Sequence, residues 1–146
     1  MELYTAAKVV SYISEIEQES LRFYETWAEA NEALRATFLS FIKENLKYEK
    51  RVKRAYYGAV TDALETGFSF KGLRGDLVIP SLGKESSPVE VLEAGLDMEE
   101  AIQEFYRKAS GLSKSLLADV SRAMAWVAKT RNARIKKLHS MSEEIR

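Results

Sequence analysis

The sequence predicts an all-α four-helix bundle built from two helical hairpins that one long crossover joins. Only two prolines occur, Pro80 and Pro88, and the chain on either side of that region is rich in strong helix formers. Apolar residues recur at spacings of three and four, and the two halves of the sequence repeat this pattern. With 146 residues, the chain is expected to form one domain over residues 1–146.

The first two helices are expected to form a hairpin with almost no connection between them. The first covers about Thr5–Ala30, and the second about Glu32–Thr66. Asn31 lies between them and is a candidate cap for the second helix. Because so short a link leaves the chain little room, the two helices should be antiparallel neighbours.

The third helix has a clear start signal. Ser87 is a candidate N-cap, Pro88 fits the first helical position, and Glu90 completes a capping box. The helix is expected to run to about Ser110, with Gly111 as its stop.

A fourth helix over about Lys114–Glu144 completes the bundle. The crossover covers residues 67–86, which carry four glycines and Pro80. Twenty extended residues reach about 60 Å, whereas a 30-residue helix is about 45 Å long. The crossover can therefore travel the whole length of the bundle. Leu77–Ile79 could be extended within it, as an isolated strand.

The two halves contain matching stripes, each on one helical face. At an offset of 82, the stripe Val10, Ile13, Glu17, Ser20, Tyr24 and Trp27 aligns with Leu92, Gly95, Glu99, Ile102, Tyr106 and Ala109. At an offset of 86, Phe38, Phe41, Asn45, Tyr48, Val52 and Ala55 align with Met124, Val127, Arg131, Arg134, Leu138 and Met141. Polar residues interrupt all four stripes at matching heights. A buried Glu or Arg costs several kcal/mol unless it is paired, so this layer is the candidate site.

The sequence resembles the rubrerythrin-like members of the ferritin-like superfamily over nearly the whole chain. The resemblance rests on a Glu-x6-Tyr motif in the first and third helices, the segment Ser-Pro-Val-Glu-Val-Leu-Glu from Ser87, and the long crossover. It implies a ferritin-like bundle with a carboxylate-bridged di-iron centre. Each half of such a bundle supplies one Glu from its first helix and a Glu-x-x-His pair from its second.

Transferred position by position, the motif gives a degenerate di-iron site. The first-helix glutamates are present as Glu17 and Glu99. The two Glu-x-x-His pairs fall on Asn45 with Tyr48 and on Arg131 with Arg134. Four of the six ligands are therefore replaced. A register shifted by one residue would offer Glu44 with Lys47, but it breaks the apolar stripe of the second helix and is rejected.

The charges of this layer predict that it needs no metal. Two carboxylates and two guanidiniums sum to zero, and arginine cannot ligate a cation. We expect Arg131 and Arg134 to occupy the space of the two irons and to pair with Glu17 and Glu99. The remaining polar groups would be satisfied by Asn45 and Tyr48 and, from just outside the ligand positions, by Tyr24 and Tyr106.

Composition excludes several kinds of chemistry. The chain has no Cys and a single His, His139, which is expected to be exposed near the end of the last helix. Thiolate metal sites and Cys nucleophiles are therefore excluded. Lys plus Arg equals Asp plus Glu at 22 each, which argues against bulk attraction to nucleic acid or to an anionic membrane.

The sequence thus favours a non-enzymatic, metal-free relative of rubrerythrin with a structural, partner-binding or small-ligand-binding role, with no cofactor. The alternative is a di-iron oxidoreductase or peroxide-scavenging protein with a remodelled site. A third hypothesis is nucleic-acid binding through a basic run that is otherwise expected to be a solvated face: Lys43, Lys47, Lys50, Arg51, Lys53 and Arg54. We expect a cytoplasmic homodimer, and scarce Asn, Gln and Cys suggest a thermophilic source.

Overall fold

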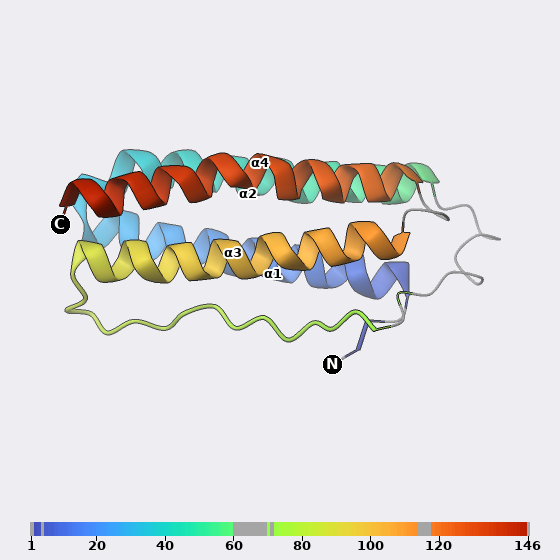
Figure 1. The fold of residues 1–146 in the computed structure, drawn as a ribbon, viewed down its shortest axis with the longest axis horizontal. Helices are drawn as coiled ribbons and strands as arrows, with labels where there is room; N and C mark the ends of the chain where they lie inside the picture. The colour runs from blue at the N-terminus through green and yellow to red at the C-terminus, as the bar shows by residue number, and fades with distance from the viewer. Residues whose placement is uncertain (1, 4, 60–69, 71, 114–117, 146) are drawn as a thin grey trace.

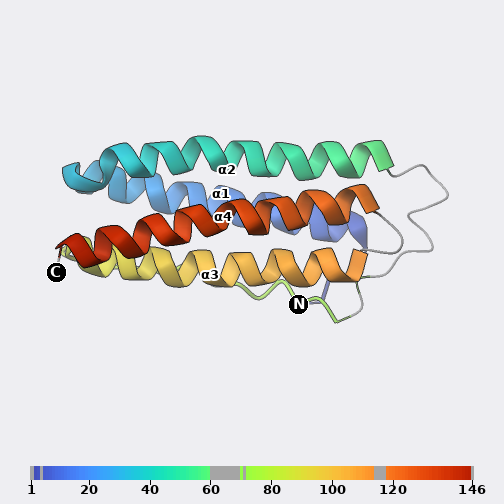
Figure 2. The same cartoon turned by 45° about the horizontal axis from the view of Figure 1, so that its top comes forward.

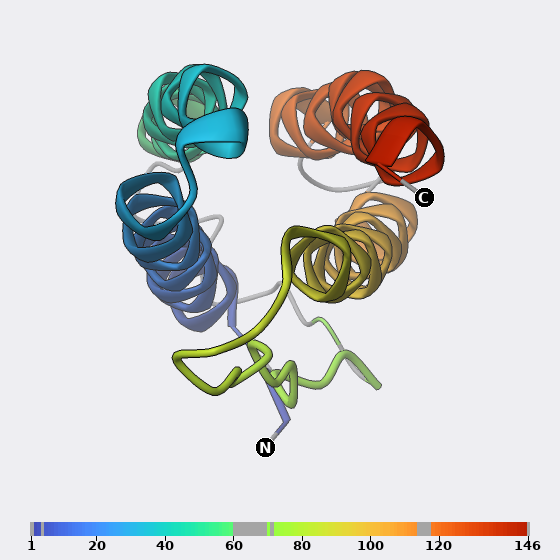
Figure 3. The same ribbon diagram turned by 90° about the vertical axis from the view of Figure 1, so that its left-hand side faces the viewer.

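The computed structural model describes all residues except 1, 4, 60–69, 71, 114–117 and 146. This part of the chain contains four helices: α1 (Ala6–Ala30), α2 (Glu32–Ala59), α3 (Pro88–Ser113) and α4 (Ala118–Ile145) (Figure 1). α1 packs on α2 and α3 packs on α4. The two hairpins lie side by side when the bundle is viewed along its axis (Figure 3). The all-α four-helix bundle of two hairpins is therefore confirmed.

Neighbouring helices within each hairpin are antiparallel. α1 and α4 run in one direction along the bundle, and α2 and α3 run in the other (Figure 2). The two hairpins meet mainly where α2 packs on α4, and α1 and α3 make fewer contacts. No helix in the described residues is both long enough and apolar enough to span a membrane.

Side chains define both ends of α1. The hydroxyl of Thr5 accepts a hydrogen bond from the backbone N–H of Lys8 at 3.1 Å, so Thr5 is the N-cap. Asn31 alone separates α1 from α2, and both its backbone N–H and its side-chain amide donate to the carbonyl of Trp27. The side chain of Asn31 thus closes α1, although the sequence suggested it as a cap for α2.

The capping box at the start of α3 is confirmed. The backbone N–H of Glu90 donates to the hydroxyl of Ser87 at 3.2 Å, and the backbone N–H of Ser87 donates to Oε1 of Glu90 at 3.0 Å. This reciprocal pair fixes the point at which the crossover ends and the second hairpin begins.

The predicted stop at Gly111 is wrong, because α3 continues through Gly111 to Ser113. A glycine stop needs a positive φ, and among the described residues only Gly72 has one. The hydroxyl of Ser113 instead donates to the carbonyls of Ala109 and Ser110 at the end of the helix. The predicted end of the second helix at Thr66 and start of the fourth at Lys114 lie outside the described residues.

The described part of the crossover runs along α1 and α3 (Figures 1 and 3). It is tied to the N-terminus by a single antiparallel bridge between Glu2 and Arg74, and to α1 by a hydrogen bond from the backbone N–H of Leu77 to the hydroxyl of Tyr12. A Cβ on Gly75 would lie 2.9 Å from the Tyr12 ring, so any larger residue there would force the ring to shift. Within the described residues Leu77–Ile79 forms no strand.

The predicted stripes face the core. Every member of the stripes on α1 and α3 is buried. On α2 and α4 the last members, Ala55 and Met141, are half-buried and the others are buried. The polar residues in the middle of the stripes therefore lie within the core of the bundle.

Candidate functional site

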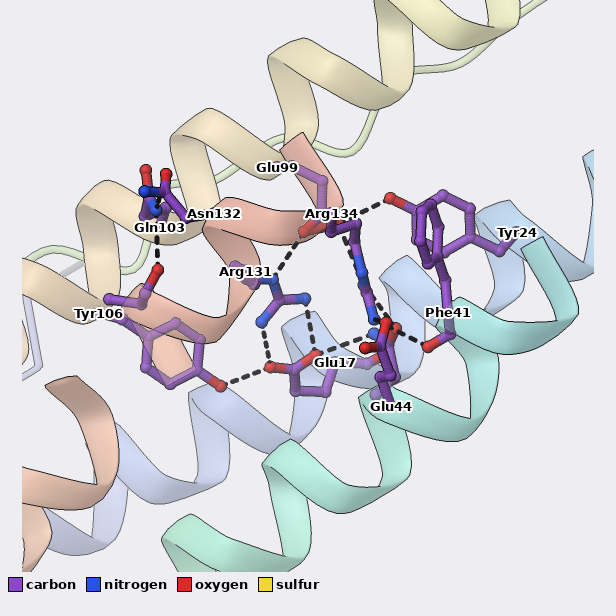
Figure 4. A network of polar contacts seen from close by, with 12 residues as sticks. Glu17, Tyr24, Phe41, Glu44, Glu99, Gln103, Tyr106, Arg131, Asn132 and Arg134 are labelled. Atoms are coloured by element: carbon purple, nitrogen blue, oxygen red, sulfur yellow. Dashed lines mark hydrogen bonds and ion pairs between the residues drawn. The ribbon is translucent and has the colours of Figure 1, made fainter. Parts of the chain in front are cut away.

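The polar layer crosses the middle of the bundle and draws on all four helices (Figure 4). Its six members are each at most 2% exposed: Glu17, Asn45, Tyr48, Glu99, Arg131 and Arg134. Helical spacing explains the arrangement, because each lies on the stripe that its helix turns toward the core. The structure thus brings together all six positions that the sequence analysis singled out.

Arg131 lies at the centre of the layer and bridges the two glutamates. Its Nη1 and Nη2 donate to the two carboxylate oxygens of Glu17 at 2.5 and 2.9 Å. Its Nε donates to Oε1 of Glu99 at 2.7 Å. The bidentate fork to Glu17 and the single bond to Glu99 use all three nitrogens of the guanidinium. Through fully buried ion pairs, Arg131 therefore joins α4 to α1 of the other hairpin by Glu17 and to α3 of its own hairpin by Glu99.

Arg134 lies one turn further along α4 and binds mainly to α2. Its Nη1 donates to Oδ1 of Asn45 at 2.8 Å and to Oε2 of Glu99 at 3.3 Å. Its Nη2 donates to the backbone carbonyl of Phe41 at 2.8 Å and to Oε1 of Glu44 at 3.2 Å. Its Nε has no partner among the described residues. Arg134 thus shares Glu99 with Arg131.

Two tyrosines repeat the same contact across the two halves. Tyr24 of α1 donates to Oε2 of Glu99 at 2.7 Å, and Tyr106 of α3 donates to Oε2 of Glu17 at 2.5 Å. Each tyrosine therefore satisfies the glutamate of the opposite hairpin. This reciprocity is the structural counterpart of the Glu-x6-Tyr repeat in the sequence.

Asn45 supports the layer, whereas the hydroxyl of Tyr48 does not. The amide of Asn45 donates to Oε1 of Glu17 at 2.8 Å and accepts from Arg134. Tyr48 was expected to satisfy a polar group too, but its hydroxyl has no partner within the described residues. The Tyr48 ring instead lies 5.0 and 5.2 Å from the guanidinium carbons of Arg131 and Arg134. The contribution of Tyr48 is therefore a cation–π contact with both arginines.

Two partners of Arg134 were missed by the sequence analysis. Glu44 was placed outside the layer, yet its half-exposed carboxylate reaches Arg134 at the rim. The carbonyl of Phe41 could not be found from side-chain types at all. The available signal for Glu44 was its position next to Asn45 and three residues after Phe41 on the same helix.

The charges in the layer hold one another in their ionised forms. Burial alone would raise the pKa of Glu99, but the charges of Arg131 and Arg134 outweigh burial and keep that pKa below its usual 4.5. Burial lowers the pKa of Arg131, but the charges of Glu17 and Glu99 raise it well above the usual value. Around physiological pH, Glu99 and both arginines therefore remain charged.

The tyrosines of the layer stay protonated over the same range. Burial, followed by the nearby Glu99 carboxylate, raises the pKa of Tyr24 well above 10, and burial with Glu17 does the same for Tyr106. Burial raises the pKa of Tyr48 to about 12. The three hydroxyls are therefore neutral groups that can donate hydrogen bonds.

The donor set does not suit a di-metal centre. Each carboxylate oxygen of Glu17 and Glu99 already accepts a hydrogen bond, from Asn45, Arg131, Arg134 or a tyrosine. Guanidiniums offer no lone pair to a cation and repel it. Among the described residues, no three Asp, Glu or His side chains form a group that could hold a metal ion. His139 is exposed on α4.

Comparisons with known proteins found no match for this chain among protein-family models, curated proteins or solved structures.

Proposed function

We propose that this chain is a metal-independent, non-enzymatic member of the ferritin-like class, in which Arg131 and Arg134 stand where the relatives hold two irons. The observation that carries the proposal is the Arg131 guanidinium, which bridges Glu17 and Glu99 in the centre of the bundle. A carboxylate-bridged di-iron centre would need those same two glutamates as ligands. Here a covalently attached cation links them instead.

Charge balance supports this proposal. Four carboxylates and two neutral imidazoles carry about four negative charges, which two divalent cations would balance. The layer described above has two buried carboxylates, Glu17 and Glu99, and two buried guanidiniums. Their charges cancel within the protein, so the layer has no net negative charge to attract a further cation.

The protonation states favour a structural or binding role over catalysis. A general acid or base works best with a pKa near the working pH. The pKa of Glu99 is below its usual value, and those of Tyr24 and Tyr106 are well above theirs. These groups are therefore fixed in the states that hold the two hairpins together, and we assign them to stability.

Metal content tests the proposal. The protein is expressed in iron-rich medium and analysed for iron and manganese and for a near-ultraviolet oxo-bridge absorption band. A matched variant restores the ligand pattern of the relatives: Asn45→Glu, Tyr48→His, Arg131→Glu and Arg134→His. We expect less than one-tenth of a metal ion per natural chain, roughly, and a clear gain of metal in the variant.

Stoichiometric iron in the natural chain, with the oxo-bridge band, would overturn the proposal and would favour the alternative of a remodelled di-iron oxidoreductase. Metal bound by an Arg131→Ala variant would not overturn the proposal, because that variant lacks the guanidinium that stands between Glu17 and Glu99.

A further inference from the structure

A second polar feature lies on the outside of the bundle, in a groove between α2 and α4. The groove has a volume of about 700 Å³, within the range of about 300–1,000 Å³ that small-molecule sites occupy. Its described charged lining is almost entirely cationic, with one tryptophan beside it: Lys47, Lys50, Arg51, Arg54, Arg122 and Trp126. The groove therefore differs in kind from the buried layer, whose charges cancel.

The positive charge of the groove is mostly unneutralised. Asp119, the one acidic residue among its described lining, forms an ion pair with Arg122. Lys47, Lys50 and Arg54 make no ion pair with any described residue. Five cations against one carboxylate leave a surplus of four positive charges in a chain whose formal net charge is zero. Such a concentration attracts anions.

The acidic residues of the same stretch of α2 have partners elsewhere. Glu49 accepts hydrogen bonds from Ser14 at 2.6 Å and Gln18 at 3.3 Å, both on α1. Glu44 reaches Arg134 at the rim of the buried layer. Acidic residues that alternate with basic ones in the sequence therefore have their partners outside the groove, and the charged lining that α2 gives the groove is basic.

The size and shape of the groove favour a compact anion. Lys47 and Arg54 are seven residues apart on α2, which is about 10 Å along the helix axis. Arg122 faces them from α4, so cations line both walls. A nucleic acid would need a positive surface that continues well beyond this length, and the neutral chain gives no sign of one. A ligand with two or three linked phosphates matches the length.

Trp126 gives the groove a second property. The guanidinium of Arg51 lies over its ring, 4.1 Å from the centroid, and the ring is half-buried beside Tyr48. This contact holds Arg51 against the groove wall, so its side chain loses less conformational entropy when a ligand binds. Displacement of Arg51 by an anion would also change the surroundings of the indole.

We propose that the groove between α2 and α4 is a binding site for a small polyphosphate, either free or as part of a nucleoside triphosphate. The shared recognition element is a run of two or three phosphates held by Lys47, Lys50, Arg51 and Arg54 on one wall and Arg122 on the other. This site is separate from the buried layer. Its failure would leave the metal-independent proposal unaffected, and metal in the buried layer would leave this one unaffected.

The test is a fluorescence titration of the intact chain in a Trp27→Phe background, where Trp126 is the single remaining tryptophan. Sodium tripolyphosphate and, in a separate titration at the same ionic strength, sodium sulfate are added to the protein. Calorimetry provides an independent measurement of binding. The variant is Lys47→Glu with Lys50→Glu. Its control is Lys136→Glu with Lys137→Glu, two exposed lysines of α4 outside the groove. Circular dichroism checks that every variant is folded.

We expect saturable binding of tripolyphosphate that sulfate does not reproduce, a loss of affinity of about tenfold or more in the groove variant, and no comparable loss in the control. A nucleoside triphosphate that binds at least tenfold more tightly than tripolyphosphate would identify the nucleotide as the source. Absence of saturable binding, or equal losses in both variants, would overturn the proposal. So would tight binding of an oligonucleotide with which tripolyphosphate does not compete.

Discussion

The hydroxyl of Tyr106 donates a hydrogen bond to Oε2 of Glu17, 2.5 Å away and 89 positions apart in the sequence. Tyr24 makes the same contact with Glu99 from the other hairpin. Arg131 then links the two glutamates, so three helices, α1, α3 and α4, are joined by charge-assisted hydrogen bonds inside an apolar core. The bonds from Tyr106 and Arg131 to Glu17 and from Tyr24 to Glu99 cross between hairpins, so the layer holds the bundle together and fixes how the hairpins are aligned.

Removal of Arg131 should be strongly destabilising. Arg131→Ala leaves Glu17 buried without its main cationic partner and weakens the pairing of Glu99. We therefore expect the free energy of unfolding to fall by about 3–5 kcal/mol, measured by chemical denaturation. The control is Arg107→Ala, which removes an exposed ion pair to Glu104 and should cost less than about 1 kcal/mol. Equal effects of the two substitutions would show that the buried pairs contribute little.

The two tyrosines should make similar contributions to stability. Tyr24→Phe and Tyr106→Phe each delete one hydrogen bond to a buried carboxylate with little change in volume. We expect each to lower the free energy of unfolding by about 1.5–3 kcal/mol. Tyr57→Phe is the matched control, because Tyr57 is 70% exposed, and it should be nearly neutral. A neutral result at Tyr24 or Tyr106 would mean that the glutamates are satisfied without them.

Much of the layer could be predicted from the sequence, and particular residues show why the rest could not. Spacings of three and four placed Glu17, Glu99 and Arg131 on core-facing stripes, because helix geometry alone decides which face a position occupies. The fate of the Tyr48 hydroxyl and the reach of Glu44 depend on rotamers and on the alignment of neighbouring helices, which one sequence does not specify.

The helix ends likewise include some that could be predicted from the sequence and some that could not. The Ser87 capping box is purely local, so its residue types were sufficient to predict it. Gly111 was misjudged because a glycine ends a helix only where the chain adopts a positive φ, and here α3 continues for two further residues. Such an outcome depends on how the next segment packs, which is a tertiary effect.

Acid should weaken the bundle through Glu99. Its pKa in the folded chain is below the value of 4.5 that it has when unfolded, so its contribution is present above pH 4.5 and is lost as the pH falls through the folded pKa. The difference in unfolding free energy between the natural chain and Glu99→Gln should therefore be largest near neutral pH and shrink below pH 4.5. A difference that is constant from neutral pH to acid would contradict this assignment.

Alkali should act through the buried tyrosines. Their pKa values in the folded chain are raised above the usual 10.0, to about 12 for Tyr48 and well above 10 for Tyr24 and Tyr106. Their contribution is complete below pH 10 and is lost as the pH rises from there through the folded pKa values. An ultraviolet titration of the folded chain should leave all three mostly protonated at pH 10 and Tyr48 half ionised only near pH 12, whereas the unfolded chain should ionise all seven tyrosines near pH 10. Coincident titration curves for the folded and unfolded chains would contradict the raised pKa values of these tyrosines.

The proposal that Arg131 and Arg134 stand in place of metal ions is tested by the thermal unfolding midpoint with and without metal. The natural chain is unfolded in a chelator and, under anaerobic conditions, in excess Fe²⁺ or Mn²⁺. A ligand at 100 times its Kd would add about 2.7 kcal/mol to the stability of a folded chain that binds it. We expect the same midpoint in all three conditions. A midpoint that rises and saturates with added Fe²⁺ or Mn²⁺ would contradict it.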